Sequence, residues 1–146
     1  MNIRPIAKSD IPFLVSAKKV FSDAWNAEML ESAFRAGNFF GFIAEEPVGE
    51  NDTPVGFITY SVNIDTADLQ DLFVSESYRN RGAGTALVKE FIAGAKSRGV
   101  KKLFLEVRES NEKAQKLYNA AGFKKISVRN KYYSDGENAF VYIKEL

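Results

Sequence analysis

The chain has 146 residues, 45% of them hydrophobic, and a nearly balanced charge of 20 basic and 19 acidic residues. This length fits one domain of ordinary size, so we expect a single domain over residues 1–146. The sequence contains no cysteine and no histidine. It therefore excludes disulfides, thiolate nucleophiles and Ser-His or Cys-His catalytic pairs, and any general base must be Asp, Glu, Lys, Tyr or a water chain.

The balanced charge gives no support for binding to nucleic acid, and no apolar run is long enough to span a membrane. The first five residues lack the apolar core of a signal peptide, so we expect a cytoplasmic protein. No clustered carboxylate motif is visible, and we expect no metal site.

Periodicity and turn residues predict six elements in the first half of the chain. Ser9 or Asp10 is placed to cap the first helix, and Asn26 and Gly37 bound the second. A polar stretch at 45–54 indicates a loop between two strands. The predicted elements are a strand at 2–5, a helix after residue 10, a helix at 27–36, and strands at 39–44, 55–63 and 68–74.

The second half alternates helices and strands before a final hairpin. Apolar spacing predicts a helix at 82–96, a strand at 100–107, a helix around 114–121, and strands at 123–133 and 138–144. A Ser-Asp-Gly turn at 134–136 joins the last two strands. The order predicts a mixed α/β domain with a central mixed sheet of about seven strands, flanked by about four helices.

The most distinctive segment is 79–85, Arg-Asn-Arg-Gly-Ala-Gly-Thr, between a predicted strand and a predicted helix. Gly82 and Gly84 permit backbone conformations closed to other residues and let a ligand approach closely. The free N–H groups and positive end of the following helix complete a pyrophosphate site. The alternative is a glycine-rich turn with solvated arginines; the spacing does not match the GxxxxGK loop of nucleotide triphosphatases.

This segment resembles the R/Q-x-x-G-x-G/A signature of the GNAT superfamily of N-acetyltransferases, with Arg79, Gly82 and Gly84 at the fixed positions. The resemblance implies the GNAT acyl-CoA N-acyltransferase fold and acetyl-CoA as cosubstrate. It also implies that main-chain amides of the segment hold the pyrophosphate and that a strand pairs with pantetheine. The cofactor-binding residues that it implies are Leu72, Phe73, Val74, Arg79, Asn80, Arg81, Gly82, Ala83, Gly84, Thr85 and Asn111.

A second motif follows, with L-E-V-R-E-S-N at 105–111, A-x-x-L-Y-x-x-x-G-F at 114–123 and a basic segment ending in Tyr132-Tyr133. This series resembles the bacterial ribosomal protein alanine N-acetyltransferases, a GNAT subfamily that acetylates the terminal α-amino group of a ribosomal protein. The resemblance implies a protein or peptide N-terminus as the acceptor.

Glu106 and Tyr118 are the candidate catalytic residues. A carboxylate accepts the proton of an ammonium, directly or through water, and a phenol protonates or hydrogen-bonds a departing thiolate. Two alternatives stay open, because Glu106 is also a plausible solvent-facing charge and Tyr118 lies on an apolar helix stripe with Ala114 and Leu117. Asn111 is well placed as a helix N-cap, a role compatible with cofactor contact.

Three aromatic residues are candidates for binding the acceptor. Trp25 lies between the first two predicted helices, where a core position is the other interpretation. Tyr132 and Tyr133 end a predicted strand, where they line a peptide groove or pack across strands.

Two other functions compete with acetylation of a protein terminus. The first keeps the chemistry and changes the acceptor to a small amine or a lysine side chain, because one fold hosts many acceptors. The second is a non-catalytic acyl-CoA-binding scaffold, which needs neither Glu106 nor Tyr118.

Overall fold

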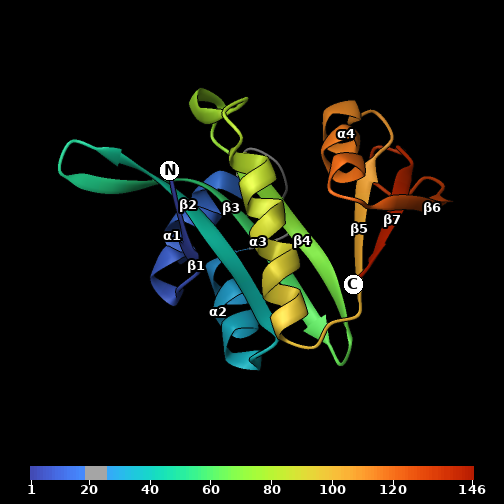
Figure 1. Ribbon diagram of the computed structural model, residues 1–146, viewed down its shortest axis with the longest axis horizontal. Coiled ribbons are helices and arrows are strands. Elements are labelled where there is room, and N and C mark those ends of the chain that lie inside the picture. The colour runs from blue at the N-terminus through green and yellow to red at the C-terminus, as the bar shows by residue number, and fades with distance from the viewer. Residues whose placement is uncertain (19–25) are drawn as a thin grey trace.

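The structure is a computed structural model that describes residues 1–18 and 26–146. The described residues form one seven-stranded sheet and four α-helices (Figure 1). The strands are β1 (Asn2–Pro5), β2 (Phe39–Val48), β3 (Asn51–Asn63), β4 (Thr66–Val74), β5 (Lys102–Arg108), β6 (Lys124–Arg129) and β7 (Ala139–Glu145). The helices are α1 (Ile11–Lys18), α2 (Ala27–Ala36), α3 (Ala83–Ser97) and α4 (Glu112–Ala120), with short 3-10 turns at Lys8–Asp10 and Glu76–Tyr78.

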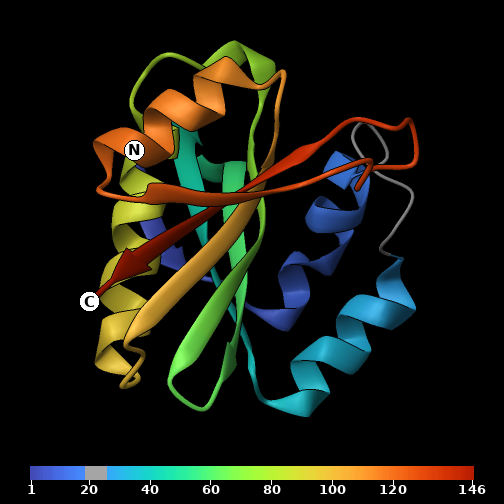
Figure 2. The same cartoon turned by 90° about the vertical axis from the view of Figure 1, so that its right-hand side faces the viewer.

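The sheet has the strand order β1-β2-β3-β4-β5-β7-β6. Neighbouring strands are antiparallel except β4 and β5, which are parallel and are joined through α3. Helices α3 and α4 cover one face, and α1 and α2 cover the other (Figure 2). This arrangement confirms the predicted mixed α/β fold.

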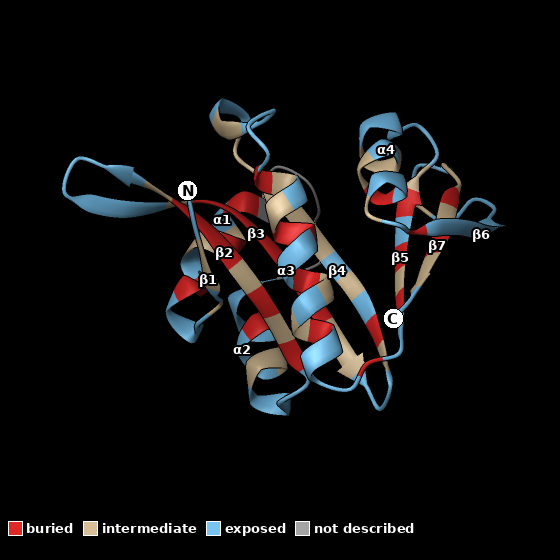
Figure 3. Ribbon diagram, viewed as in Figure 1, coloured by how far each residue is buried: buried red, intermediate tan, exposed pale blue. Residues whose placement is uncertain are grey.

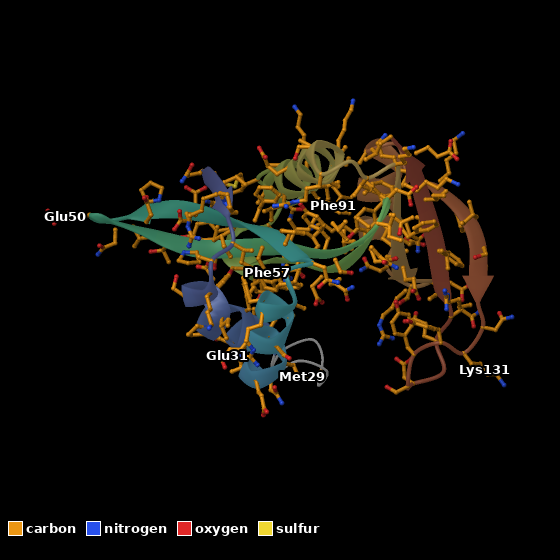
Figure 4. The ribbon with its side chains drawn as sticks, turned by 90° about the horizontal axis from the view of Figure 1, so that it is seen from below. Met29, Glu31, Glu50, Phe57, Phe91 and Lys131 are labelled. Atoms are coloured by element: carbon orange, nitrogen blue, oxygen red, sulfur yellow. The ribbon has the colours of Figure 1, made fainter. Side chains whose placement is uncertain are left out.

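Two hydrophobic cores lie on opposite faces of the sheet. On one face, Phe91 of α3 is fully buried and its ring centroid lies 4.8 Å from that of Tyr60. On the other face, Phe57 and Ile43 of the central strands pack with Leu30 of α2. Phe91 and α2 accordingly lie on opposite sides of the sheet (Figure 4), and buried residues concentrate in the central strands (Figure 3). None of the helices in the described ranges is long and apolar enough to cross a membrane.

The helix caps mostly follow the sequence signals. The Asn26 side chain accepts a hydrogen bond from the Met29 amide at 2.9 Å, and Gly37 ends α2 with a left-handed φ of 79°. Asp10 behaves differently from the expected cap. Its carboxylate turns back and accepts hydrogen bonds from the Ala7 amide and from the Arg4 guanidinium of β1.

The predicted loop at 45–54 is wrong. Strands β2 and β3 continue through it as a hairpin arm, with Val48 paired to Asn51 across a turn that contains Gly49. The arm projects beyond the helices, with Glu50 at its tip (Figure 4). Its residues 47–53 are exposed, so the sequence there has neither an apolar run nor the apolar-polar alternation that would predict a strand.

The predicted strand at 123–133 is also too long. Strand β6 ends at Arg129, because the chain turns where Lys131 adopts a left-handed φ of 51° and its amide donates to the Asn138 side chain. Tyr132 and Tyr133 therefore lie in a loop rather than in a strand. We call residues 130–138 the tyrosine loop; it lies on the α1–α2 side of the sheet (Figure 2).

The pairing between β4 and β5 is short, and it leaves a gap between the ends of these two strands. It runs from Thr66 opposite Lys102 to Asp68 opposite Phe104, after which the two strands separate. Strand β4 carries an extra residue, Gln70, between the partners of Thr59 and Tyr60, just beyond the last pair. A bulge of this kind bends a strand and increases its twist, which turns the rest of β4 away from β5.

Candidate active site

A groove of about 610 Å³ lies between the end of β4, the start of α3 and one side of α4. We call it the α3–α4 groove. It contains ten of the eleven predicted cofactor-binding residues, Arg81 being the exception. The residues that line it are Leu72, Phe73, Val74, Tyr78, Arg79, Asn80, Gly82, Ala83, Gly84, Thr85, Asn111, Lys113, Ala114, Lys116, Leu117 and Ala120.

The backbone of the glycine-rich segment has the shape of an anion site. Asn80 and Gly82 both adopt left-handed conformations, with φ of 63° and 85°, and Gly82 is the N-cap of α3. Such alternation turns successive N–H groups toward one concavity, at the positive end of a helix. A Cβ built on Gly82 meets nothing within 4 Å, so the space beside it is open.

The arginines of this segment have structural contacts. The Arg79 Nε donates to the Val74 carbonyl at 2.9 Å and ties the glycine-rich segment to the end of β4. The Arg81 guanidinium lies 5.3 Å from the Tyr78 ring centroid. Arg79 thus shapes the groove, whereas Arg81 does not line it.

Two lysines of α4 were missed by the sequence reasoning. Lys113 and Lys116 line the α3–α4 groove, and the Lys113 ammonium donates to the Asn80 side chain at 2.8 Å. That bond joins α4 to the glycine-rich segment. Asn111 caps α4, since its side chain accepts from the Ala114 amide at 3.1 Å, and it also lines the groove.

A second opening of about 410 Å³, the β5 pocket, lies beside β5 and the tyrosine loop. Along β5, Leu103, Leu105 and Val107 belong to the core under α3, so Phe104 and Glu106 project from the opposite face. The α3–α4 groove and the β5 pocket therefore approach the gap between β4 and β5 from opposite sides. The residues that line the β5 pocket are Asp68, Leu69, Gln70, Phe104, Leu105, Glu106, Arg129, Tyr132, Tyr133 and Val141.

Glu106 lies in this pocket with charged and phenolic neighbours. Its carboxylate is 3.7 Å from the Arg129 Nε, and about a third of its side chain is exposed. The charge of Glu106, then burial and a hydrogen bond to Glu106, raise the pKa of Tyr132. The Tyr132 and Tyr133 rings pack edge to face, with centroids 5.1 Å apart. The structure thus brings Glu106 and both tyrosines together.

Tyr118 is buried under α4 and packs edge to face on Phe123. Burial, and then the charge of Asp71 and the phenol of Tyr133, raise the pKa of Tyr118 far above its ordinary value. The raised pKa keeps this phenol protonated near neutral pH, so it remains a hydrogen-bond donor. The two groups that act on it electrostatically, Asp71 and Tyr133, belong to β4 and to the tyrosine loop. Tyr118 itself is not among the residues that line the α3–α4 groove or the β5 pocket.

Asp68 and Arg129 complete the charges of the β5 pocket. Burial raises the pKa of the Asp68 carboxyl, and the Arg129 guanidinium lies 5.6 Å from the Tyr132 ring centroid. Trp25, the third predicted acceptor-binding residue, lies outside the described residues.

Comparison with known proteins agrees with this geometry. The model of the acetyltransferase (GNAT) family matches residues 8–123. The ribosomal protein bS18-alanine N-acetyltransferase of Haemophilus ducreyi is 38% identical over 96 residues, which cover 63% of this chain and 66% of that protein. The match to this curated relative therefore spans about two thirds of its length.

Two solved structures have the same fold. The Escherichia coli ribosomal-protein-S18-alanine N-acetyltransferase has a TM-score of 0.84 at 28% identity, over 99% of this chain and 92% of that one. Arabidopsis thaliana NAA60 in complex with acetyl-CoA has a TM-score of 0.87 at 20% identity, over 99% and 98%. The family model, the fold and the glycine-rich segment agree, and the chain belongs to the acetyltransferase (GNAT) family.

Proposed function

We propose that this chain transfers the acetyl group of acetyl-CoA to the N-terminal α-amino group of a protein, with the terminal alanine of a ribosomal protein as the leading candidate. The observation that carries the proposal is the pair of openings that approach the gap between β4 and β5 from opposite sides of the sheet. Similarity to ribosomal protein alanine N-acetyltransferases supports this choice of acceptor.

The α3–α4 groove fits acetyl-CoA. The left-handed backbone at Asn80 and Gly82, the start of α3 and the lysines of α4 offer N–H donors and positive charge to a pyrophosphate. The main chain of β4 beyond Asp68, where β5 no longer pairs with it, offers a strand edge to the amides of pantetheine. When bound, acetyl-CoA supplies an acetyl group activated as a thioester.

Glu106 is the proposed base. An α-amino group has a pKa of about 7.7–8.0, so near neutral pH most of it is ammonium and must lose a proton before it attacks a carbonyl. The Glu106 carboxylate accepts this proton, directly or through water, from an amine that enters through the β5 pocket. Tyr132 and Tyr133 line the same pocket and are proposed to contact the peptide.

Tyr118 is the proposed acid. Its raised pKa keeps the hydroxyl protonated near neutral pH. We infer that this hydroxyl reaches the gap from the α4 side, where the sulfur of the cosubstrate would lie. It donates a hydrogen bond or a proton to the departing thiolate. Base and acid thus act from opposite faces of the sheet, which suits a direct transfer between two ligands held together.

The test of this function compares two acceptors with acetyl-CoA. One is a short peptide with a free N-terminal alanine, and the other is the same peptide with a blocked terminus and an internal lysine. We expect acetylation of the free terminus alone, and mass spectrometry of both peptides measures it. Reaction at the lysine alone, or at neither peptide while acetyl-CoA still binds, contradicts the proposal and favours a different amine or a scaffold.

The same assay tests Glu106 as the base. We expect Glu106→Gln to lower kcat by a factor on the order of 10²–10³ at pH 7. The loss should shrink as the pH rises above the pKa of the amine, because the free amine then needs no base. Glu90→Gln, on the exposed side of α3, is the matched control and should keep the wild-type profile. A deficit that does not vary with pH would remove Glu106 from the base role.

A further inference from the structure

Arg108 belongs to the L-E-V-R-E-S-N motif, yet the proposed chemistry does not use it. In the structure its Nη1 donates to Asp135 at 2.8 Å and to Glu137 at 2.9 Å, both in the tyrosine loop. Its guanidinium carbon lies 4.0 Å from the Tyr133 ring centroid. One side chain thus holds two carboxylates and one aromatic ring of the same loop.

The tyrosine loop is also bound by its own backbone and by the segment after β5. The Tyr133 amide donates to the Glu137 carbonyl, and the Gly136 amide donates to the Tyr133 carbonyl. The Ser110 amide donates to the Glu137 carboxylate at 3.1 Å. Glu137 therefore receives a donor from each side, and the loop is fixed relative to the end of β5.

The main chain of Arg108 holds the start of α4. Its carbonyl accepts from the Asn111 amide at 2.9 Å and from the Gln115 side chain at 3.2 Å. The side chain of the same residue holds the tyrosine loop. The helix that carries Tyr118 and the loop that carries Tyr133 thus share one anchor, two residues beyond Glu106.

The exposure of this cluster indicates a role other than stability. The side chains of Arg108, Asp135 and Glu137 are 39%, 60% and 23% exposed, and ion pairs near the surface contribute little to folding. A loop held in its binding conformation before the ligand arrives instead lowers the entropic cost of binding. Tyr132 and Tyr133 line the β5 pocket, so their order bears on the acceptor.

We propose that Arg108 is a positioning residue, whose guanidinium holds Asp135, Glu137 and the Tyr133 ring and so keeps the tyrosine loop in the conformation that receives the acceptor peptide. The link to the acceptor rests on the proposed function. The cofactor groove lies on the other face of the sheet, so Arg108 should govern the peptide KM and leave the binding of acetyl-CoA unchanged.

The test uses Arg108→Met and Arg108→Lys, with Arg98→Met as the matched control. Arg98 also stacks on an aromatic ring, 3.3 Å from the Phe40 centroid, but at the far end of α3. We expect Arg108→Met to raise the peptide KM about tenfold with a smaller change in kcat. The Kd for acetyl-CoA should stay unchanged. Arg108→Lys keeps the positive charge but lacks the planar guanidinium, so we expect it to restore the peptide KM only in part.

Hydrogen exchange of the amides at 130–138 provides a readout that does not depend on turnover. We expect faster exchange there in Arg108→Met but not in Arg98→Met. Unchanged exchange, or faster exchange with an unchanged peptide KM, overturns the proposal. If Arg108→Met does not fold, Glu137→Gln must show the same two effects in smaller measure. If the wild type acetylates neither peptide, the proposed function fails, and exchange alone decides whether Arg108 orders the loop.

Discussion

At the level of single residues, Gly82 and Gly37 form a matched pair. Both have left-handed φ, 85° and 79°, both sit at a helix end, and a Cβ on either meets nothing within 4 Å. An alanine at such a position strains the backbone, so Gly82→Ala and Gly37→Ala should each lower the free energy of unfolding by about 1 kcal/mol.

Only Gly82 lines the α3–α4 groove, however. We therefore expect Gly82→Ala to weaken acetyl-CoA binding about tenfold, because the methyl group intrudes on the phosphate space, while Gly37→Ala binds as the wild type does. Calorimetric titration of the two variants measures this difference. Equal affinities would show that the glycine-rich segment serves the fold alone.

The residues of the site differ in how far the sequence could predict them. Asn111 as a cap and Gly82 as a left-handed turn depend on a few neighbours in the chain, and the structure has both. The Lys113–Asn80 bond joins residues 33 positions apart, so no local pattern marks it. The contacts of Arg108 could not be predicted for the same reason, since its partners Asp135 and Glu137 lie beyond a helix and a strand.

At the level of elements, the buried strands were predictable and the exposed ones were not. Residues 55–60 of β3 are buried in succession, which an apolar run reveals. The hairpin arm of β2 and β3 contains Pro47 and Pro54 and is exposed, so its pairing is set by the turn at Gly49 rather than by a hydrophobic pattern. The tyrosine loop follows β6, whose six residues are all exposed. Because buried and exposed residues do not alternate along β6, no pattern indicated where this strand ends.

The junction of β1, α1 and β2 is held by a charged cluster. Arg4 of β1 pairs with Asp10 at 2.7 Å and with Glu45 of β2 at 3.1 Å, and both carboxylates are buried. Burial works to raise the pKa of Asp10, but hydrogen bonds from Arg4 and the Ala7 amide hold it below the ordinary value. The contribution to stability is therefore present above the unfolded pKa of about 3.9 and is lost as pH falls through the folded pKa.

We expect Arg4→Met to destabilise the fold by about 2–3 kcal/mol at pH 7, because it removes the cation with which both buried carboxylates pair within the described residues. A third of the Arg4 side chain is exposed, which keeps the loss moderate. The loss should shrink as pH falls below about 4. Urea unfolding at pH 7 and at pH 3 measures it, with Arg35→Met on exposed α2 as a control that costs about 0.5 kcal/mol or less. A loss of equal size at both values would contradict the assignment.

At the level of the whole molecule, charge is divided along the chain although the total is balanced. Residues 1–78 contain five basic and twelve acidic side chains, whereas residues 79–146 contain fifteen and seven. The α3–α4 groove takes Arg79, Lys113 and Lys116 from the basic part. The β5 pocket takes Asp68 from the acidic part, and there Asp68 and Glu106 outnumber Arg129. This division suits a site that admits a polyanionic cosubstrate on one face and an ammonium on the other.

The division predicts that salt weakens acetyl-CoA binding through the phosphates rather than through the acyl arm. Screening lengths fall from about 10 Å at 0.1 M to about 3 Å at 1 M, so exposed lysines lose most of their attraction over that range. We expect the Kd for acetyl-CoA to rise roughly fivefold to tenfold between about 0.05 and 0.5 M NaCl. Lys113→Met should bind more weakly and show a shallower dependence. Acetyl-pantetheine, which lacks the phosphates, is the control ligand and should bind independently of salt; an equal salt dependence for both ligands would place the effect outside the groove and refute the assignment of its lysines.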